Sequence, residues 1–228
     1  MTQLLQRSIT NHRVFPGLAK DGLPFIGVGA ALTGVTALAA HSEALLPLTL
    51  LPLALTGLVT YFFRDPERVL PTDARFLYAP ADGRVMMVEE IEEERFIKGP
   101  ATRIVIFLSI FNVHINRTPT AGVVHYREHV PGNFHAAWKK EIEPGNERQY
   151  LGLETPRGPI LVVQVAGLLA RRIVCRPQIG EELLAGQRIG LIKFSSRTDL
   201  IFPRGTATPL VAPGMPVHGG VTPIGEYR

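Results

Sequence analysis

The chain has 228 residues, enough for one domain with an appendage, and 46% of them are hydrophobic while only 19% are charged. Its mean hydropathy of +0.15 is high for a soluble protein, and its net charge of +4 suits an anionic membrane surface and nucleic acid equally. No Lys/Arg-rich run with interleaved aromatic residues is present, which argues against nucleic-acid binding, and the single Cys175 excludes an intramolecular disulfide.

The N-terminal part of the chain changes sharply in composition. Residues 1–22 are polar and basic, whereas residues 23–63 contain Glu43 as their only charged residue. Two apolar stretches, each close to the roughly 20 residues of a membrane-crossing helix, flank a short polar break at residues 41–43. Basic residues lie outside both ends of this region, so the positive-inside rule predicts a helical hairpin with both ends in the cytoplasm.

A secretory signal peptide is the alternative interpretation of this apolar region. The region starts too late, runs too long and lacks a convincing cleavage site, which favours a membrane anchor. Pro47 and Pro52 interrupt the second stretch, so a re-entrant or interfacial hairpin stays open beside a spanning one. We expect a separate folded domain over residues 64–228.

The remainder of the chain has the pattern of a β-rich domain. Short β-branched runs such as "RIVIFLSIFNVHI", "GPILVVQVAG" and "QRIGLIKF" predict strands, and Gly180, Gly186 and Gly190 would supply tight bends between them. Only "NFHAAWKKEI" and "GEELLAGQ" hint at a helix or turn, and the Pro/Gly-rich residues from Thr206 onward indicate a loop-like tail, partly ordered if it lies on the sheet. We therefore expect a mainly β (α+β) fold, a small antiparallel β-sandwich or barrel-like body preceded by the hydrophobic helical hairpin.

Three polar clusters fall at expected strand ends or turns: "APADGRV" (79–85), "FNVHINRTPTAG" (111–122) and "FSSRTD" (194–199). Each has an ordinary structural explanation, with Asp82 as a turn residue before glycine and His114 as a hydrogen-bonded structural histidine. An Asp/His/Ser set in this order is weak evidence of a nucleophile, because most chains of this length contain one. No nucleotide-binding motif and no metal site is predicted.

Taken together, the clusters are more specific. From "FFRDPER" through "APADGRV", "FLSIFNVHINRTPTAG", "PGNF", "NER" and "GEELLAGQRIGLIKFSSRTDLIFP", residues 61–203 resemble the phosphatidylserine decarboxylase family of the short, membrane-anchored type. The resemblance implies a lyase of phospholipid biosynthesis, which converts phosphatidylserine to phosphatidylethanolamine and CO₂. The implied cofactor is a pyruvoyl group made by the protein itself.

The resemblance also implies that the chain is a zymogen that cleaves itself. Ser196 would attack the carbonyl group of Ser195, and the chain would break between these two residues. The pyruvoyl group derived from Ser196 would then form a Schiff base with the substrate amine and accept the electrons left behind by CO₂.

Four other residues are candidates for the site. His114 would move protons, and Asp82 would orient and polarise the base. Arg117 or Arg197 would bind the substrate phosphate or carboxylate, as charge type alone indicates. Some members of the family have two histidines in the segment matching "VHINRTP", and here Arg117 stands at the second position. Whether His114 serves both self-cleavage and decarboxylation is therefore left open.

The expected partners are the lipid bilayer, the phospholipid substrate and the protein's own cleaved large and small subunits, with no nucleic acid and with a homo-oligomer as an open question. The catalytic domain is expected on the cytoplasmic face of the cell membrane. The family usually has glycine before the reactive serine, where this chain has Ser195. This leaves one alternative, an uncleaved, membrane-tethered β-domain that acts as a binding or regulatory module. A related lipid substrate also stays open.

Overall fold

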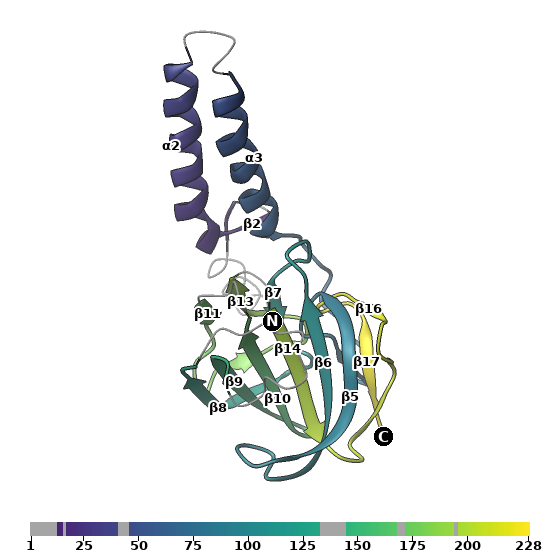
Figure 1. Ribbon diagram of the computed structural model, residues 1–228. Coiled ribbons are helices and arrows are strands. Elements are labelled where there is room, and N and C mark those ends of the chain that lie inside the picture. Colours follow the sequence, from purple (N-terminus) through teal and green to yellow (C-terminus); the bar gives the residue numbers. More distant parts are fainter. Residues whose placement is uncertain (1–12, 16, 41–45, 133–144, 168–171, 194–195) are drawn as a thin grey trace. The chain divides into compact units, whose positions relative to one another are not determined.

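A computed structural model describes residues 13–15, 17–40, 46–132, 145–167, 172–193 and 196–228 (Figure 1). The chain forms two compact units, one of which covers Ile9–Glu67 and the other Arg68–Arg228. Each unit is described by itself. The segment "NFHAAWKKEI" and Ser195 lie outside the described residues.

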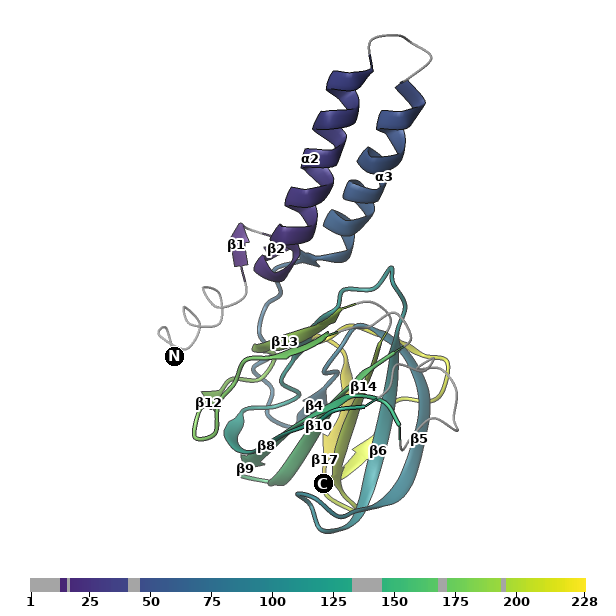
Figure 2. The same cartoon turned by 60° about the vertical axis from the view of Figure 1, so that its left-hand side comes forward.

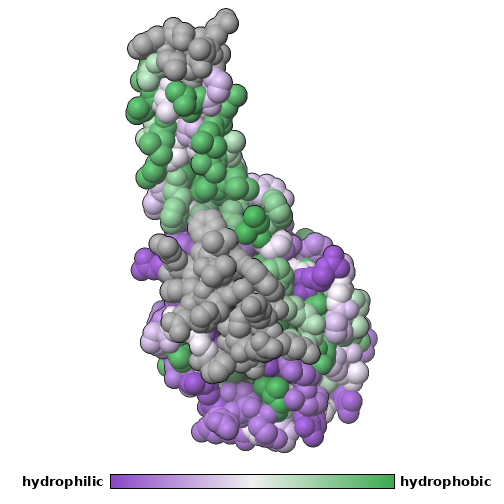
Figure 3. All heavy atoms as spheres, viewed as in Figure 1, coloured by the Kyte–Doolittle hydropathy of each residue, from purple (hydrophilic) through white to green (hydrophobic). Residues whose placement is uncertain are grey.

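The first unit contains two apolar helices, α2 (Leu23–Ala39) and α3 (Leu46–Phe62). The other elements of this unit are β1 (Arg13–Phe15), β2 (Gly17–Ala19), η1 (Lys20–Gly22) and β3 (Arg64–Asp65). The helices approach closely at Gly29, where a Cβ atom would lie 2.4 Å from the Thr56 hydroxyl oxygen. Their outward side chains are mainly apolar, as the green surface of both helices shows (Figure 3).

One of the two apolar helices has the length that a membrane crossing requires. Lys20–Ala39 is long and apolar enough to cross a bilayer, whereas Pro47–Phe62 is a shorter apolar helix. Thr56 donates its hydroxyl proton to the Pro52 carbonyl oxygen at 2.7 Å, so the polar side chain is satisfied within the helix.

The second unit is built around one curled antiparallel sheet of eight strands in the order β12-β8-β9-β10-β14-β6-β5-β16 (Figure 2). The bounds of these strands, in that order, are Glu182–Leu183, Gly122–Val130, Arg148–Thr155, Gly158–Ala166, Ser196–Pro203, Gly99–Leu108, Gly83–Glu93 and Pro216–Val217. Two three-stranded sheets complete it. One contains β11 (Arg172–Cys175), β13 (Arg188–Lys193) and β7 (Ile115–Arg117), and the other contains β15 (Ala207–Pro209), β17 (Pro223–Tyr227) and β4 (Phe76–Tyr78). The predicted mainly β, barrel-like body is confirmed.

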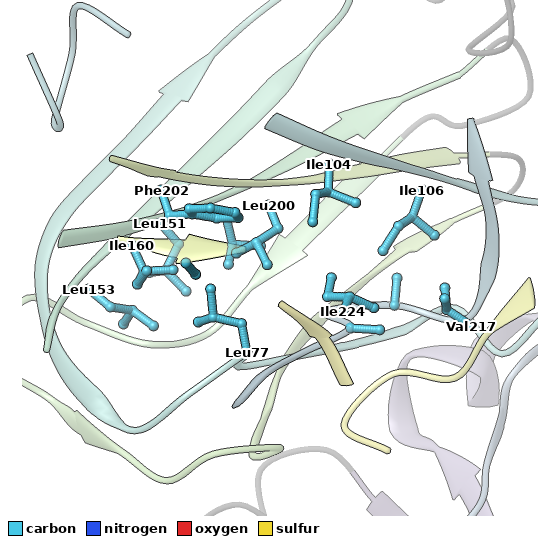
Figure 4. Close-up of a cluster of buried hydrophobic side chains, with 14 of the residues drawn as sticks. Leu77, Ile104, Ile106, Leu151, Leu153, Ile160, Leu200, Phe202, Val217 and Ile224 are labelled. Atoms are coloured by element: carbon cyan, nitrogen blue, oxygen red, sulfur yellow. The ribbon is translucent and has the colours of Figure 1, made fainter. Parts of the chain in front are cut away.

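The main core lies between the eight-stranded sheet and the β15-β17-β4 sheet (Figure 4). Because side chains alternate along a strand, Leu200 and Phe202 of β14 face this core, where they join Leu77 and Ile224. Ile201 belongs instead to a second cluster, formed on the opposite face of the sheet. The same alternation decides which polar residues of β14 point toward the main core.

The structure corrects two expectations about the chain's glycine- and proline-rich parts. The segment after Thr206 contributes β15, β16 and β17, because its short stretches find partner strands that local composition does not reveal. Gly190 lies within β13 and forms no bend. A Cβ atom at this position would stand 1.8 Å from the Val174 carbonyl oxygen, so glycine permits the close approach of β11.

Candidate active site

Backbone and side-chain hydrogen bonds bring the three polar clusters together. The Arg117 backbone N–H donates to the Pro80 carbonyl oxygen at 2.8 Å, which holds the Asp82 loop beside β7. The Asn116 amide in β7 donates to the Thr198 hydroxyl in β14 at 2.9 Å. Segments that are far apart in the sequence therefore meet near the end of the large sheet at which β14 begins.

Ser196 is the first residue of β14, which is paired with Leu108 of β6 on one side and with Ala166 of β10 on the other. Its side chain shares a face with Thr198 and Leu200, and the residue is fully buried. Within the described part of the chain, its hydroxyl oxygen has no hydrogen-bond partner. A buried hydroxyl in this state is unusual and is often functional.

His114 directly precedes β7, and it is 2% exposed. Its Nδ1 lies 3.0 Å from the Asn112 carbonyl oxygen. A carbonyl oxygen can only accept, so Nδ1 carries the proton and the lone pair of the neutral ring is on Nε2. The register pairs the next residue, Ile115, with Leu191 of β13, so His114 lies toward the end of β13 from which the chain continues to Ser196.

Asp82 has contacts that sequence reasoning missed. Arg68 donates to both carboxylate oxygens of Asp82, at 2.6 and 2.8 Å, and also to the Gly219 carbonyl oxygen. The Gly219 N–H donates to Asp82 Oδ1 at 2.8 Å, and His218 Nδ1 lies 3.7 Å from Oδ2. His114 is not among the described partners of Asp82. The carboxylate therefore ties its own loop to Arg68 and to the 218–219 loop.

The two candidate substrate-binding arginines are both engaged by protein groups. Arg117 is 1% exposed and donates to the Gly186 carbonyl oxygen at 2.9 Å. Arg197 points to the face of β14 opposite Ser196, where its guanidinium binds both carboxylate oxygens of Asp199 at 2.8 Å. The structure thus does not bring the Arg197 side chain together with the Ser196 hydroxyl.

Two other polar residues of these clusters had weak signals in the sequence. Arg68, the partner of Asp82, is one of the basic residues that follow the apolar region, and no other pattern marks it as part of the site. Gln164 is the one polar residue inside the apolar strand run "ILVVQVA", and that interruption is the signal that could have found it. Its Nε2 donates to Asn116 Oδ1 at 2.8 Å. Among the described residues, no group of three or more His, Cys, Asp and Glu side chains could hold a metal ion.

These features define a class of protein: a β-rich domain with a buried serine hydroxyl and a buried histidine near one end of its main sheet, in a chain that also carries an apolar helical segment. The model of the family described as phosphatidylserine decarboxylase matches residues 55–225. The chain belongs to the phosphatidylserine decarboxylase family.

Individual relatives agree with this assignment. A phosphatidylserine decarboxylase proenzyme of Symbiobacterium thermophilum is 51% identical over 92% of this chain and 96% of the relative's length. Proenzymes of the same name from Desulfotalea psychrophila and Erythrobacter litoralis are 44% and 41% identical over 92% and 94% of this chain, and over 96% and 90% of their own lengths. The name proenzyme says that these relatives are made as precursors of the active enzyme.

Proposed function

We propose that this chain is a proenzyme that cleaves itself between Ser195 and Ser196 and then decarboxylates phosphatidylserine to phosphatidylethanolamine and CO₂. The observation that carries the proposal is the buried Ser196 hydroxyl, which has no hydrogen-bond partner among the described residues. Ser196 is the first residue of β14, a central strand of the large sheet. His114 lies toward the end of β13 that leads to it, and the family membership supplies the substrate class.

The cleavage chemistry uses only groups of this chain and one water molecule. The Ser196 hydroxyl attacks the carbonyl carbon of Ser195, so that a C–O bond forms while the peptide C–N bond breaks, and the freed nitrogen takes up the hydroxyl proton. Loss of the α-proton of residue 196 expels the carboxylate of Ser195. Water then releases ammonia and leaves a pyruvoyl group at the new N-terminus. His114 Nε2 is the base that carries protons in these steps.

The residues around position 196 fit such a group. Ala166 stands opposite in β10 and is small, the position is shielded from water, and the strand end is held by pairing on both sides. When present, the pyruvoyl carbonyl binds the substrate amine and accepts the electrons left by CO₂.

Asp82 and the two arginines have supporting parts in this proposal. Asp82 holds its loop in place through Arg68 and Gly219. Arg117 or Arg197 binds the substrate phosphate or carboxylate, in addition to the hydrogen bonds that these residues make to Gly186 and Asp199. The helix α2 anchors the chain in the membrane where the lipid substrate resides, with the catalytic domain on the cytoplasmic side, as the basic flanks indicate.

Intact mass under denaturing conditions tests self-cleavage. Two fragments meeting at the 195/196 bond are expected, and the smaller should have a blocked N-terminus. Ser196→Ala should give one uncut chain with no activity. The cleaved protein should release CO₂ from phosphatidylserine in detergent micelles.

The outcomes separate the proposal from its rival. A single full-length wild-type species that releases no CO₂ would overturn it and favour a binding module. In that case Ser195→Gly, which restores the residue usual in the family, shows whether Ser195 has blocked the chemistry. Cleaved protein that acts only on another amine-bearing lipid would overturn the substrate assignment and keep the chemistry.

A further inference from the structure

A buried polar network runs across the sheets beside Ser196. Gln164 of β10 donates to Asn116 Oδ1 of β7 at 2.8 Å, and Asn116 donates to the Thr198 hydroxyl of β14 at 2.9 Å. Gln164 Nε2 also lies 3.4 Å from the carbonyl oxygen of Val174 in β11. All three polar side chains are at most 1% exposed. The network thus joins the large sheet to the small sheet that carries β7.

Burying the polar side chains of this network costs free energy that a purely structural element could avoid. Removing amide and hydroxyl groups from water costs free energy unless each finds a partner, and apolar side chains of similar volume would pack the same space without that cost. The neighbours of Gln164 along its strand, Val163 and Val165, are apolar and buried. A function that needs polar atoms here explains their presence better than packing does.

Two atoms near the network lack partners among the described residues, and they are complementary. Gln164 Oε1 is a hydrogen-bond acceptor, and the Ser196 hydroxyl is a donor. Gln164 lies directly opposite Thr198, while Ser196 lies directly opposite Ala166. Gln164 and Ser196 are therefore diagonal neighbours on one face, roughly 7–8 Å apart at Cα, within reach of a long side chain.

We propose that Gln164 is a positioning residue for self-cleavage: its amide NH₂ holds β7 through Asn116, and its Oε1 accepts a hydrogen bond from the Ser196 hydroxyl once the side chains turn toward each other, a bond that the structure itself does not contain. This inference rests on the proposed function and adds a residue to it. The amide sets the separation between β7, which His114 directly precedes, and the start of β14, where the nucleophile lies. The bond to Oε1 fixes the hydroxyl rotamer before the proton passes to His114.

The experiment follows the rate of self-cleavage of full-length protein, synthesised in vitro in the presence of detergent, by the appearance of the small fragment on denaturing gels. Gln164→Leu keeps the volume and removes both hydrogen bonds. We expect cleavage to slow roughly 100-fold, the size of effect that small misplacements of reacting groups produce. The thermal midpoint of the Gln164→Leu variant is measured in the uncleavable Ser196→Ala background, so that an effect on folding stability can be told from an effect on the cleavage rate.

The matched control is Gln149→Leu. Gln149 is also a buried glutamine, and it lies opposite Gln164 in β9, but its amide donates to the backbone oxygens of Glu128 and Tyr150. A general penalty for losing a buried amide would slow both variants alike. We expect Gln149→Leu to cleave at close to the wild-type rate at temperatures where it is folded.

A second variant gives a readout that a structural role would not move. Gln164→Glu retains the acceptor but can donate to Asn116 only when it is protonated, and burial raises the pKa of a carboxyl group. The ratio of its cleavage rate to that of wild type should therefore rise as the pH falls from about 8 to about 6. Taking the ratio removes the pH effects that the two proteins share.

The results distinguish this inference from the proposed function. If wild type does not cleave, the proposed function fails. If wild type cleaves and Gln164→Leu is within about threefold of it, the positioning role alone is overturned. Equal slowing of Gln149→Leu overturns it as well. A Gln164→Glu ratio that stays constant with pH would contradict the assignment of the amide as the donor to Asn116.

Discussion

The ion pair between Arg68 and Asp82 allows a quantitative test of how the Asp82 loop is held. The two side chains are 12% and 8% exposed and share two short hydrogen bonds. Arg68→Met keeps much of the apolar stem but leaves the Asp82 carboxylate buried without its cation, a change that typically costs about 3–5 kcal/mol. Asp82 retains the Gly219 N–H, so we expect the lower end, about 3 kcal/mol. For a domain of this size, a loss of that free energy lowers the thermal midpoint by roughly 6–12 °C.

The assay is thermal unfolding of the full-length chain in detergent micelles, in the Ser196→Ala background. Arg75→Met is the matched control, because Arg75 makes the same kind of contact to Asp73 with side chains that are 67% and 38% exposed. A surface pair of this type is screened by solvent and contributes little to stability. The double variant Arg68→Met/Asp82→Asn should recover most of the loss, since no unpaired charge remains. Equal shifts for Arg68→Met and Arg75→Met would refute the reasoning.

Two further predictions concern single positions. Gly83→Ala should destabilise the domain by about 2–3 kcal/mol, because the new Cβ would lie 2.1 Å from the Phe107 carbonyl oxygen. Gly99→Ala should be nearly neutral in the same melting assay, because apart from its chain neighbours no heavy atom of the described residues lies within 4 Å of the new Cβ. Equal effects of the two substitutions would contradict the prediction. Burial raises the pKa of the Cys175 thiol from 9.0 to about 11, so at pH 8 its thiolate is about 100-fold rarer than that of an ordinary thiol. Alkylation by iodoacetamide should be correspondingly slow in native protein and fast in urea, and similar rates in both would show that the thiol is not shielded.

The fold class could be predicted from the sequence because its signals are local. β-branched runs separated by glycine and proline indicate strands whatever their order in the sheet. The strands after Thr206 were missed because Pro216 and Val217 become a strand only by pairing with Arg84 and Gly83. Such pairing depends on residues far along the chain, and no local pattern encodes it.

In the candidate site, too, the residue types could be predicted from local sequence, whereas their partners could not. Asp82, His114 and Ser196 could be picked out as residue types at strand ends, but the partners of Asp82 stand 14 and 137 positions away in the chain, at Arg68 and Gly219. The placement of Arg197 was available in principle. Two adjacent residues of a strand point to opposite faces, so strand alternation alone predicts that the side chains of Arg197 and Ser196 lie on opposite faces of β14.

The position of β14 within the large sheet has a consequence for the lifetime of the protein. β14 lies between β10 and β6, and β16 and β17 from the same C-terminal stretch pair with β5 and β4. After a cut before Ser196, unfolding would release two separate chains, and refolding would require them to find each other again. Recovery would then depend on protein concentration, and the missing covalent link would make unfolding in a dilute membrane effectively one-way. The mature protein would last only as long as its barrier to unfolding holds.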